Sequence, residues 1–330
     1  MQQPSWDIIG NRKWGYLFSL LVIIPGIIAL AVNGLNLGVD FTGGTFLDLR
    51  LEKDFTTGQV RQVLDAFGLG RSIIQKGAGH DLSIRTRFLS EEERGKVLQA
   101  LRGKFGEVTV LRADEVGPRI GRELRTIAIL GVVIGLLLQV VYISYRFKSV
   151  RFAVAADLAL LHDILVVLAA FSISRKEVNS SFVAVLLTVV GYSINDTIVL
   201  FDRIRENLSL RAREPFDRLV NRSILEALVR SLNTSITTIL AIGAVYFFGG
   251  PTIRDFAFGL MVGIATGAYS SIFTASPILV DWHLWSQRQR AQPAAEARLP
   301  LEEPSPVPAA SPSGGAGTTR PQRKHKKRRK

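Results

Sequence analysis

Residues 181–201 have the sequence SFVAVLLTVVGYSINDTIVLF, a run with no lysine, arginine or glutamate and a single aspartate, Asp196. A bilayer core about 30 Å thick is crossed by roughly 20 apolar residues of helix. The run has the length and the composition of such a helix. We therefore expect residues 181–201 to cross a membrane, with Asp196 inside it.

Five further stretches of similar length also lack lysine, arginine and glutamate. They are residues 14–32, 126–145, 152–173, 232–249 and 256–280. The expected fold is a polytopic α-helical membrane protein with six transmembrane helices, which excludes a soluble enzyme. A cleavable signal peptide is the alternative for residues 14–32. We expect an uncleaved anchor, because the Ala-Leu-Ala triplet at 29–31 lies inside the apolar run and Trp14 suits a membrane interface.

The charges of the short connections orient these helices. With the N-terminus inside, the two internal connections carry ten lysine and arginine residues and the two external connections carry three. Positive charge is retained on the cytoplasmic side of short loops. We therefore expect residues 1–13, the loop 202–231 and the tail 281–330 in the cytoplasm, with residues 33–125 outside it.

Residues 33–125, between the first two spans, are too numerous for a turn. We expect two helices there, one capped by Thr56 or Thr57 and one capped by Ser90 with Glu93 in a capping box. Strands are expected at residues 45–51, 72–75, 82–86 and 107–111. The order β-α-β-β-α-β is that of ferredoxin-like domains, so we expect an extracytoplasmic α+β domain. Many functions share this fold, and it locates no site by itself.

The chain has no cysteine, and its net charge is +13. The lack of cysteine excludes disulfides and thiolate metal sites, and no nucleophile–base pair or metal-ligand spacing is present. We therefore expect no enzymatic activity, no cofactor and no metal. From about residue 289 the tail is rich in proline, alanine, glycine and serine and ends in a basic run. We expect it to be disordered and to contact anionic membrane lipids; RNA is the weaker alternative, and no nucleic acid is required.

Three aspartates lie inside the expected spans: Asp157, Asp163 and Asp196. A carboxylate at the bilayer centre costs about 2.5 to 3.5 kcal/mol on insertion scales, and such groups usually handle protons or ions. Asp157 lies near the cytoplasmic end of its span, where we favour a structural role. Asp163 follows His162 near mid-span, and for this pair a structural role and ion coupling are equally open.

Asp196 is the strongest candidate for ion coupling. It lies five residues before the end of its span and shares a helix face with Ser193 and Thr197. Arg230 precedes the next span at comparable depth, so the two charges are candidate partners. Pairing would favour the charged acid and loss of the partner would favour protonation, as a proton carrier requires. A fixed ion pair that only sets helix register is the alternative.

Glycines mark two further features. Gly259 and Gly263 lie four residues apart on the last span, a spacing typical of helices that pack closely. Residues 38–45, GVDFTGGT, precede the first expected strand, and Gly43 and Gly44 permit a turn at positive φ.

Several of these segments together resemble the SecD/SecF family of bacterial protein-export membrane subunits, in its SecF branch. The resemblance covers residues from about 6 to 285 in order and spacing. Its motifs are VGYSINDTIV at 190–199, FDRIREN at 201–207, RSLNTS at 230–235, LHD at 161–163 and VDFTGGT at 39–45. The matching positions include Gly191, Ser193, Asn195, Thr197, Asn233, Asp40, Phe41, Gly43 and Gly44. The string at 190–207 is specific, whereas the glycine turn alone is weak.

The resemblance implies a role in the bacterial inner membrane. SecF forms a heterodimer with SecD, which also has six spans, of the resistance-nodulation-division transporter type. The pair is an auxiliary part of the Sec translocase and uses the proton or sodium gradient for late export steps, with SecYEG, YajC and the preprotein as further partners. By matching position, Asp196 would handle the proton and Arg230 would be its charged partner, while the external domain would contact SecD and the emerging substrate. Half of a lipid or drug exporter and a non-transducing scaffold are the alternatives.

Overall fold

The computed structural model describes residues 6–77, 79–210 and 213–296. The expectations for the first five residues and for the tail beyond residue 296 fall outside the described residues. The chain divides into two units, Met1–Trp285 and Ser286–Lys330. Of the second unit, the structure describes the end of the last helix.

Long apolar helices make up most of the first unit. In the described part of the chain, six helices are long and apolar enough to cross a membrane, as the sequence predicts. They are α1 (Arg12–Asn33), α5 (Pro118–Phe147), α6 (Val150–Ser174), α7 (Ser180–Leu210), α8 (Phe216–Phe248) and a last helix built from α9 (Pro251–Ser270), the π-helical segment η1 (Ser271–Ala275) and α10 (Ser276–Glu296).

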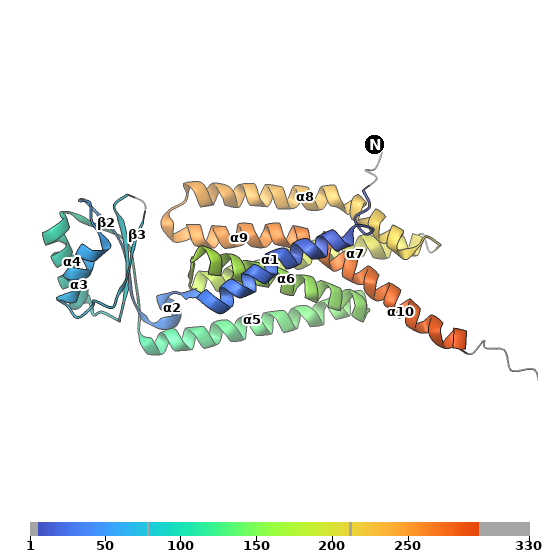
Figure 1. The fold of residues 1–330 in the computed structure, drawn as a ribbon, viewed down its shortest axis with the longest axis horizontal. Helices are drawn as coiled ribbons and strands as arrows, with labels where there is room; N and C mark the ends of the chain where they lie inside the picture. Colours follow the sequence, from blue (N-terminus) through green and yellow to red (C-terminus); the bar gives the residue numbers. More distant parts are fainter. Residues whose placement is uncertain (1–5, 78, 211–212, 297–330) are drawn as a thin grey trace, which may run out of the picture. The chain divides into compact units, whose positions relative to one another are not determined.

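The helices α6, α7 and α9 form the centre of this bundle. Half of the apolar stretch of α6 and of α7 is buried, and 61% of that of the last helix, against 17% in α1 and α8 and 6% in α5. α9 packs on both α6 and α7, α1 packs on α6, and α8 packs on α9 (Figure 1). The outer helices therefore present apolar faces that suit lipid or another membrane protein.

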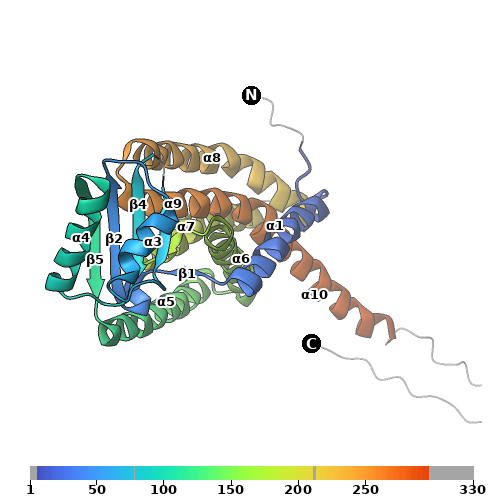
Figure 2. The ribbon, with the colours of Figure 1, turned by 60° about the vertical axis from the view of Figure 1, so that its left-hand side comes forward.

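A small α/β domain lies between α1 and α5 in the chain. Its elements are β2 (Gly44–Leu51), α3 (Thr57–Asp65), β3 (Ile73–Lys76), β4 (Asp81–Thr86), α4 (Glu91–Phe105) and β5 (Val108–Val116). In the described residues its strands form one antiparallel sheet in the order β3-β4-β2-β5, of which Figure 2 shows β5, β2 and β4 side by side. α3 and α4 cover the face away from the long helices (Figure 1), with Leu47, Leu49, Val60 and Leu101 in the core between.

Both helices of this domain begin at the expected caps. The Thr56 hydroxyl accepts a hydrogen bond from the Gln59 amide, the Ser90 hydroxyl accepts one from the Glu93 amide, and both capping boxes are closed. Glu93 also accepts hydrogen bonds from Arg87. These bonds, and the one from the Ser90 amide, lower the pKa of the Glu93 carboxyl to about 2. The helix start is therefore strongest above the ordinary glutamate pKa and weakens as the pH falls towards 2.

Two expected boundaries differ from the structure. The strand expected at 107–111 extends to Val116, because β5 pairs along the full length of β2. Most of the loop expected at 202–231 is helical, since α7 continues to Leu210 and α8 begins at Phe216. Arg203 shows why the helices continue beyond the apolar runs: it forms ion pairs with Glu206 on its own helix and with Glu226 on α8.

Gly43 and Gly44 turn the chain from the bundle into β2, as the sequence predicts. They follow the short helix α2 (Val39–Thr42), and their φ angles are 73° and 128°. A Cβ atom on Gly43 would lie 2.7 Å from the Cα atom of Pro118, at the start of α5. Glycine is therefore needed at position 43 both for the backbone angle and for the close approach of α5.

We expect Gly43→Ala to lower thermal stability more than Gly34→Ala. Gly34 has φ 62° and ψ −166°, and Gly43 has φ 73° and ψ 159°. Alanine in this region of backbone space costs on the order of 1–3 kcal/mol. A Cβ on Gly34 meets nothing within 4 Å, so only Gly43→Ala adds a clash with Pro118. Melting curves of the purified chain in detergent measure the difference, and equal losses would contradict the role of close approach.

Candidate ion-coupling site

Asp196 lies on α7 and faces α8. It is 9% exposed, and both of its carboxylate oxygens are 2.5 Å from the hydroxyl oxygen of Ser231, which donates the hydrogen bond. Within the described residues, no lysine, arginine or histidine forms an ion pair with Asp196. One hydroxyl donor stabilises a buried carboxylate less than a cation would, so the charged form of Asp196 is poorly supported in this arrangement.

The expected ion pair between Asp196 and Arg230 is not formed in the described part of the chain. Successive positions on a helix point about 100° apart, so the rotation of α8 that brings Ser231 to Asp196 directs Arg230 elsewhere. The Arg230 side chain is exposed. It nevertheless lines a cavity of about 300 Å³ together with Asp196, Tyr192 and Thr234. The two charges thus share one polar cavity between α7 and α8 without forming an ion pair.

Asp163 on α6 is completely buried, with 0% exposure, and is the acceptor of a polar cluster. It receives hydrogen bonds from Ser193 on α7 at 2.5 Å and from Ser270 on α9 at 2.7 Å. The hydroxyl of Thr266 is 3.4 Å from its other oxygen, and Nδ1 of His162 is 3.0 Å from that same oxygen. One carboxylate therefore connects α6 to both α7 and α9.

His162 extends this cluster towards α1. It is 6% exposed, and its ring stacks on that of Tyr269 with 6.0 Å between centroids. The Tyr269 hydroxyl donates to the backbone carbonyl of Gly15 on α1 at 2.7 Å. The Nε2 atom of His162 is buried and has no hydrogen-bond partner among the described residues.

The π-helical segment η1 adjoins the same cluster. It begins at Ser271, whose hydroxyl oxygen is 2.8 Å from that of Thr197 on α7. Such segments are rare and often occur at functional sites. This segment was not expected from the sequence, although a signal exists. Pro277 lacks the N–H that would bond to the carbonyl of Phe273, so regular α-helical bonding fails just there.

The site lies in a part of the chain that matches a known family. A family model described as protein export membrane protein SecD/SecF, C-terminal, matches residues 96–285, and one described as the SecD/SecF GG motif matches residues 28–54. The chain belongs to the SecD/SecF family. The first match contains α6 to α9 and every carboxylate of the site.

Relatives of this SecD/SecF chain are similar to it in sequence along most of its length. A protein translocase subunit SecF from Thermobaculum terrenum is 43% identical over 84% of this chain and 93% of its own length. One from Alicyclobacillus acidocaldarius is 39% identical, with 90% of this chain and 99% of the relative covered. The SecF resemblance drawn from the motifs is confirmed.

Solved structures show the same architecture. The crystal structure of SecDF, a translocon-associated membrane protein from Thermus thermophilus, matches with a TM-score of 0.79 at 38% identity over 85% of this chain. SecDF in its super-membrane-facing form matches with a TM-score of 0.65 at 37% identity over 90% of this chain. This chain spans only 39% and 41% of the length of those two SecDF chains.

The GG-motif region of this SecD/SecF chain joins the α/β domain to the bundle. The Asp40 carboxylate accepts hydrogen bonds from the amide of Ser180 at 2.7 Å and from its hydroxyl at 2.5 Å, at the start of α7. An acid there satisfies a free amide of the first helical turn and complements the helix dipole. Phe41 is 6% exposed and packs in the core between α6 and α7. The motif thus fixes the start of the helix that carries Asp196.

Two glycines of α9 face α7 at very short range. A Cβ atom on Gly259 would lie 2.8 Å from Cγ1 of Val185, and one on Gly263 would lie 2.0 Å from Cγ2 of Val189. Real Cβ contacts are longer, so only glycine permits the observed distance between α9 and α7.

The remaining motif residues lie on the outside of the chain. Gly191 and Asn195 on α7 and Asn233 on α8 are exposed, on the same two helices as Arg230. A Cβ atom on Gly191 would meet nothing within 4 Å among the described residues, so packing against them does not explain the glycine. In the described ranges no three histidine, aspartate or glutamate side chains cluster as a metal site.

Proposed function

We propose that this chain is the SecF subunit of a bacterial Sec translocase and couples proton movement through the inner membrane to a late step of protein export. The observation that carries the proposal is Asp196, a buried carboxylate held by one hydroxyl on the wall of a polar cavity that also contains Arg230. Buried ionisable groups in membrane spans usually serve ion pathways. Sodium is the alternative ion, because the hydroxyl and amide oxygens of Tyr192, Asn195 and Thr234 line the same cavity.

Asp196 can alternate between two environments in this cavity. A protonated Asp196 needs only the partner it has, the hydroxyl of Ser231. A charged Asp196 attracts the guanidinium of Arg230, which lines the same cavity. One charge that crosses the membrane releases about 2.3 kcal/mol per 100 mV. Because conformations a few kcal/mol apart respond to such a bias, protonation can shift how α8 packs on α7.

We assign Asp163 and His162 the task of positioning α7 for this coupling. Asp163 holds α6 against Ser193, three residues before Asp196 on α7. Thr197, the next residue after Asp196, bonds to the first residue of η1. The cluster thereby fixes the rotation of α7 that directs Asp196 towards Ser231. A displacement of the cluster would therefore change the direction of the Asp196 side chain.

We further propose that the α/β domain within residues 33–125 is ferredoxin-like and lies outside the cytoplasm, with both termini inside. Its element order and the strand order β3-β4-β2-β5 support the ferredoxin-like assignment. The ten basic residues of the internal connections, against three in the external ones, support the orientation.

A second membrane subunit of the SecD type is the partner that this proposal needs. Gly191, Asn195, Arg230 and Asn233 are exposed on α7 and α8, next to the cavity of Asp196. Polar groups that face lipid are costly, so a partner helix is expected to cover them. The SecDF chains are more than twice as long as the part this chain matches, which supports such a partner. SecYEG, YajC and the preprotein complete the proposed partners, and no enzymatic activity or cofactor is part of the proposal.

We expect Asp196→Asn to abolish the gradient-dependent part of protein export. Asparagine keeps the size of the side chain and accepts a hydrogen bond from Ser231, but it cannot ionise. The measurement is export into vesicles that contain the variant and its SecD-type partner, with and without a proton gradient. Asp202→Asn is the matched control on the same helix, because Asp202 is 39% exposed and pairs with Arg146. Undiminished gradient-dependent export by Asp196→Asn would leave the scaffold role instead.

A further inference from the structure

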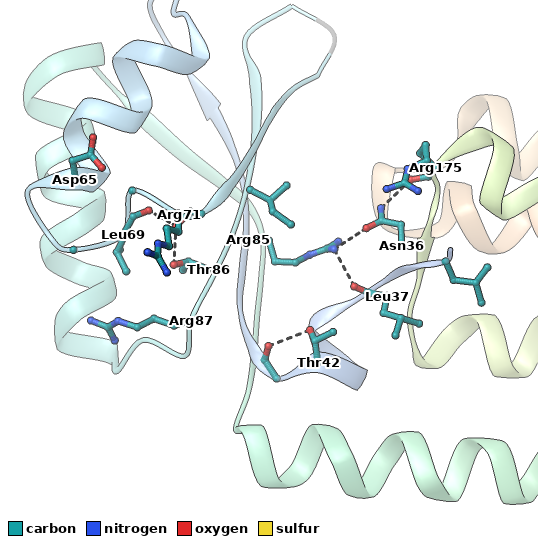
Figure 3. A pocket seen from close by; sticks show the side chains of 16 residues that line it. Asn36, Leu37, Thr42, Asp65, Leu69, Arg71, Arg85, Thr86, Arg87 and Arg175 are labelled. Atoms are coloured by element: carbon teal, nitrogen blue, oxygen red, sulfur yellow. Dashed lines mark hydrogen bonds between the residues drawn. The ribbon is translucent and has the colours of Figure 1, made fainter. Parts of the chain in front are cut away.

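A large basic cavity lies where the α/β domain meets the bundle (Figure 3). Its volume is about 980 Å³, and its walls come from the α3–β3 connection, the end of β4, the β1 (Asn36–Leu37) and α2 segment, and the end of α6. Four arginines line it, Arg71, Arg85, Arg87 and Arg175, against one acid among the described lining residues, Asp65. The cavity therefore favours an anionic occupant.

The four arginines differ in how far they are already engaged. Arg85 is committed, because it donates to Asn36 and to the carbonyl of Leu37 and lies 3.4 Å from Glu177. Arg87 pairs with Glu93. Arg175 donates one hydrogen bond to a backbone carbonyl at the end of α1. Arg71 is exposed and forms no hydrogen bond or ion pair with another described residue, so its guanidinium is available for an incoming carboxylate.

The first residue of β3, a strand with a free edge, lines the cavity. β3 is the outermost strand in the described sheet and pairs only with β4, from Ile73 opposite Arg85 to Lys76 opposite Leu82. The main-chain groups on its other side have no strand partner, and such an edge is a template for a further strand. A lysine on an edge strand often hinders pairing with another strand. Here the Lys76 ammonium is turned away and donates to the carbonyl of Phe55 at 3.1 Å. Ile73, at the start of β3, is 53% exposed and lines the cavity.

We propose that this groove, formed by the β3 edge and the cavity beside it, receives an extended, acidic segment of a polypeptide in transit, which adds to β3 as a further strand. This identity of the occupant rests on the proposed export function. Main-chain hydrogen bonds recognise a strand with little regard to sequence, and side-chain pockets add selectivity. The selectivity here comes from Arg71 on one wall and Arg175 on the opposite wall (Figure 3), with Ile73 to contact an apolar side chain.

A phospholipid headgroup is the competing occupant and is less favoured by the positions of these groups. Of the cationic lining residues, Arg175 stands at the end of a membrane-spanning helix. Arg71 and the free strand edge belong to the α/β domain instead. A headgroup cannot pair with the main-chain groups of β3 as a further strand does. The edge strand is thus the observation that separates a peptide from a lipid.

The test is direct binding of labelled peptides to the purified full chain in detergent, measured by fluorescence anisotropy. The probes are a strand-forming peptide of alternating glutamate and valine, the same peptide with lysine for glutamate, and an acidic peptide with prolines that remove main-chain donors. We expect the first to bind and the other two to bind much more weakly. We expect Arg71→Glu and Ile73→Asp each to weaken binding of the first peptide by about tenfold or more. Arg102→Glu, an exposed arginine of α4 outside the lining residues, should change nothing.

Three results would overturn the proposal. Equal binding of the proline peptide would show an anion site without strand addition. Unchanged affinity in Arg71→Glu would show that the groove is not the binding site. Absence of peptide binding, with Arg71-dependent binding of phosphatidylglycerol micelles, would assign the groove to a headgroup. The binding assay needs no gradient and no export, so it tests the groove proposal separately from the coupling proposal. Normal gradient-dependent export by Asp196→Asn would contradict the coupling proposal alone. Absence of peptide binding would contradict the groove proposal alone.

Discussion

Asp163→Leu is expected to leave little folded protein in the membrane, whereas Asp163→Asn is expected to fold. Leucine removes the acceptor shared by Ser193, Ser270 and Thr266 and by the imidazole of His162. Polar links in membrane proteins average about 0.6 kcal/mol and reach about 1.7 kcal/mol, so four of them total roughly 2 to 7 kcal/mol. A larger apolar side chain in a packed core adds about 1–3 kcal/mol of strain. The sum is comparable with the whole stability of a typical protein, about 5–15 kcal/mol.

Asparagine retains most of these contacts. Its carbonyl oxygen can accept from His162 and Thr266, and its amide can donate to the two serine hydroxyls. Ser270 is free to turn towards the carbonyl of Gly267, which lies 3.2 Å from its hydroxyl oxygen. Detergent-solubilised yield and the melting temperature of tryptophan fluorescence measure both variants. A leucine variant as stable as the asparagine variant would show that the hydroxyls simply re-pair with carbonyls of their own helices.

The same pair of variants separates positioning from coupling. If Asp163 only positions α7, Asp163→Asn should retain gradient-dependent export, in contrast to Asp196→Asn. If Asp163 must ionise, Asp163→Asn should fold normally and still lose the gradient-dependent part. The export assay described for Asp196→Asn, applied to Asp163→Asn, distinguishes these two outcomes.

The spans and the helix starts could be predicted because their causes are local. An apolar run of bilayer length has to be helical in lipid, and Ser90 with Glu93 satisfies the first amides of α4 from within four residues. The Asp163 cluster has no such local cause. Its donors stand 30 and 107 residues away in the sequence, at Ser193 and Ser270, and serine is common in membrane spans. The sequence therefore marked Asp163 as unusual without revealing what it binds.

The depth of Arg230 could be predicted, but the rotation of its helix could not. Depth follows from the number of residues to the end of the apolar run. Rotation depends on how α8 packs against α7 and α9, and one residue changes the direction by about 100°. Ser231 therefore takes the position opposite Asp196 that the sequence suggested for Arg230. Arg230 and Asp196 do not form the expected ion pair, but they line the same cavity.

Gly263→Val is expected to separate α9 from α7 and to destabilise the bundle severely. The Cβ of any larger residue at this position would lie 2.0 Å from Cγ2 and 2.8 Å from Cγ1 of Val189, far inside contact distance. Neither atom can move away easily, because Val189 is 0% exposed. Overpacking of this kind costs typically about 1–3 kcal/mol, and here it acts on two of the central helices. The displacement should also reach the Asp163 cluster, since Thr266 and Ser270 lie on the same helix as Gly263.

Val189→Ala should restore part of the stability lost in Gly263→Val, because it removes the two methyl groups that the new side chain meets. The matched control is Gly131→Val on α5, where a Cβ would meet nothing within 4 Å. A double-mutant cycle measures the coupling between positions 263 and 189. It compares the melting temperatures of the wild type, Gly263→Val, Val189→Ala and the double variant. An additive cycle, or an equal loss from Gly131→Val, would mean that the glycine serves helix flexibility and not the close approach of α9. A strong positive coupling would place the distance between α7 and α9 under the control of this one contact, and with it the rotation that presents Asp196 to α8.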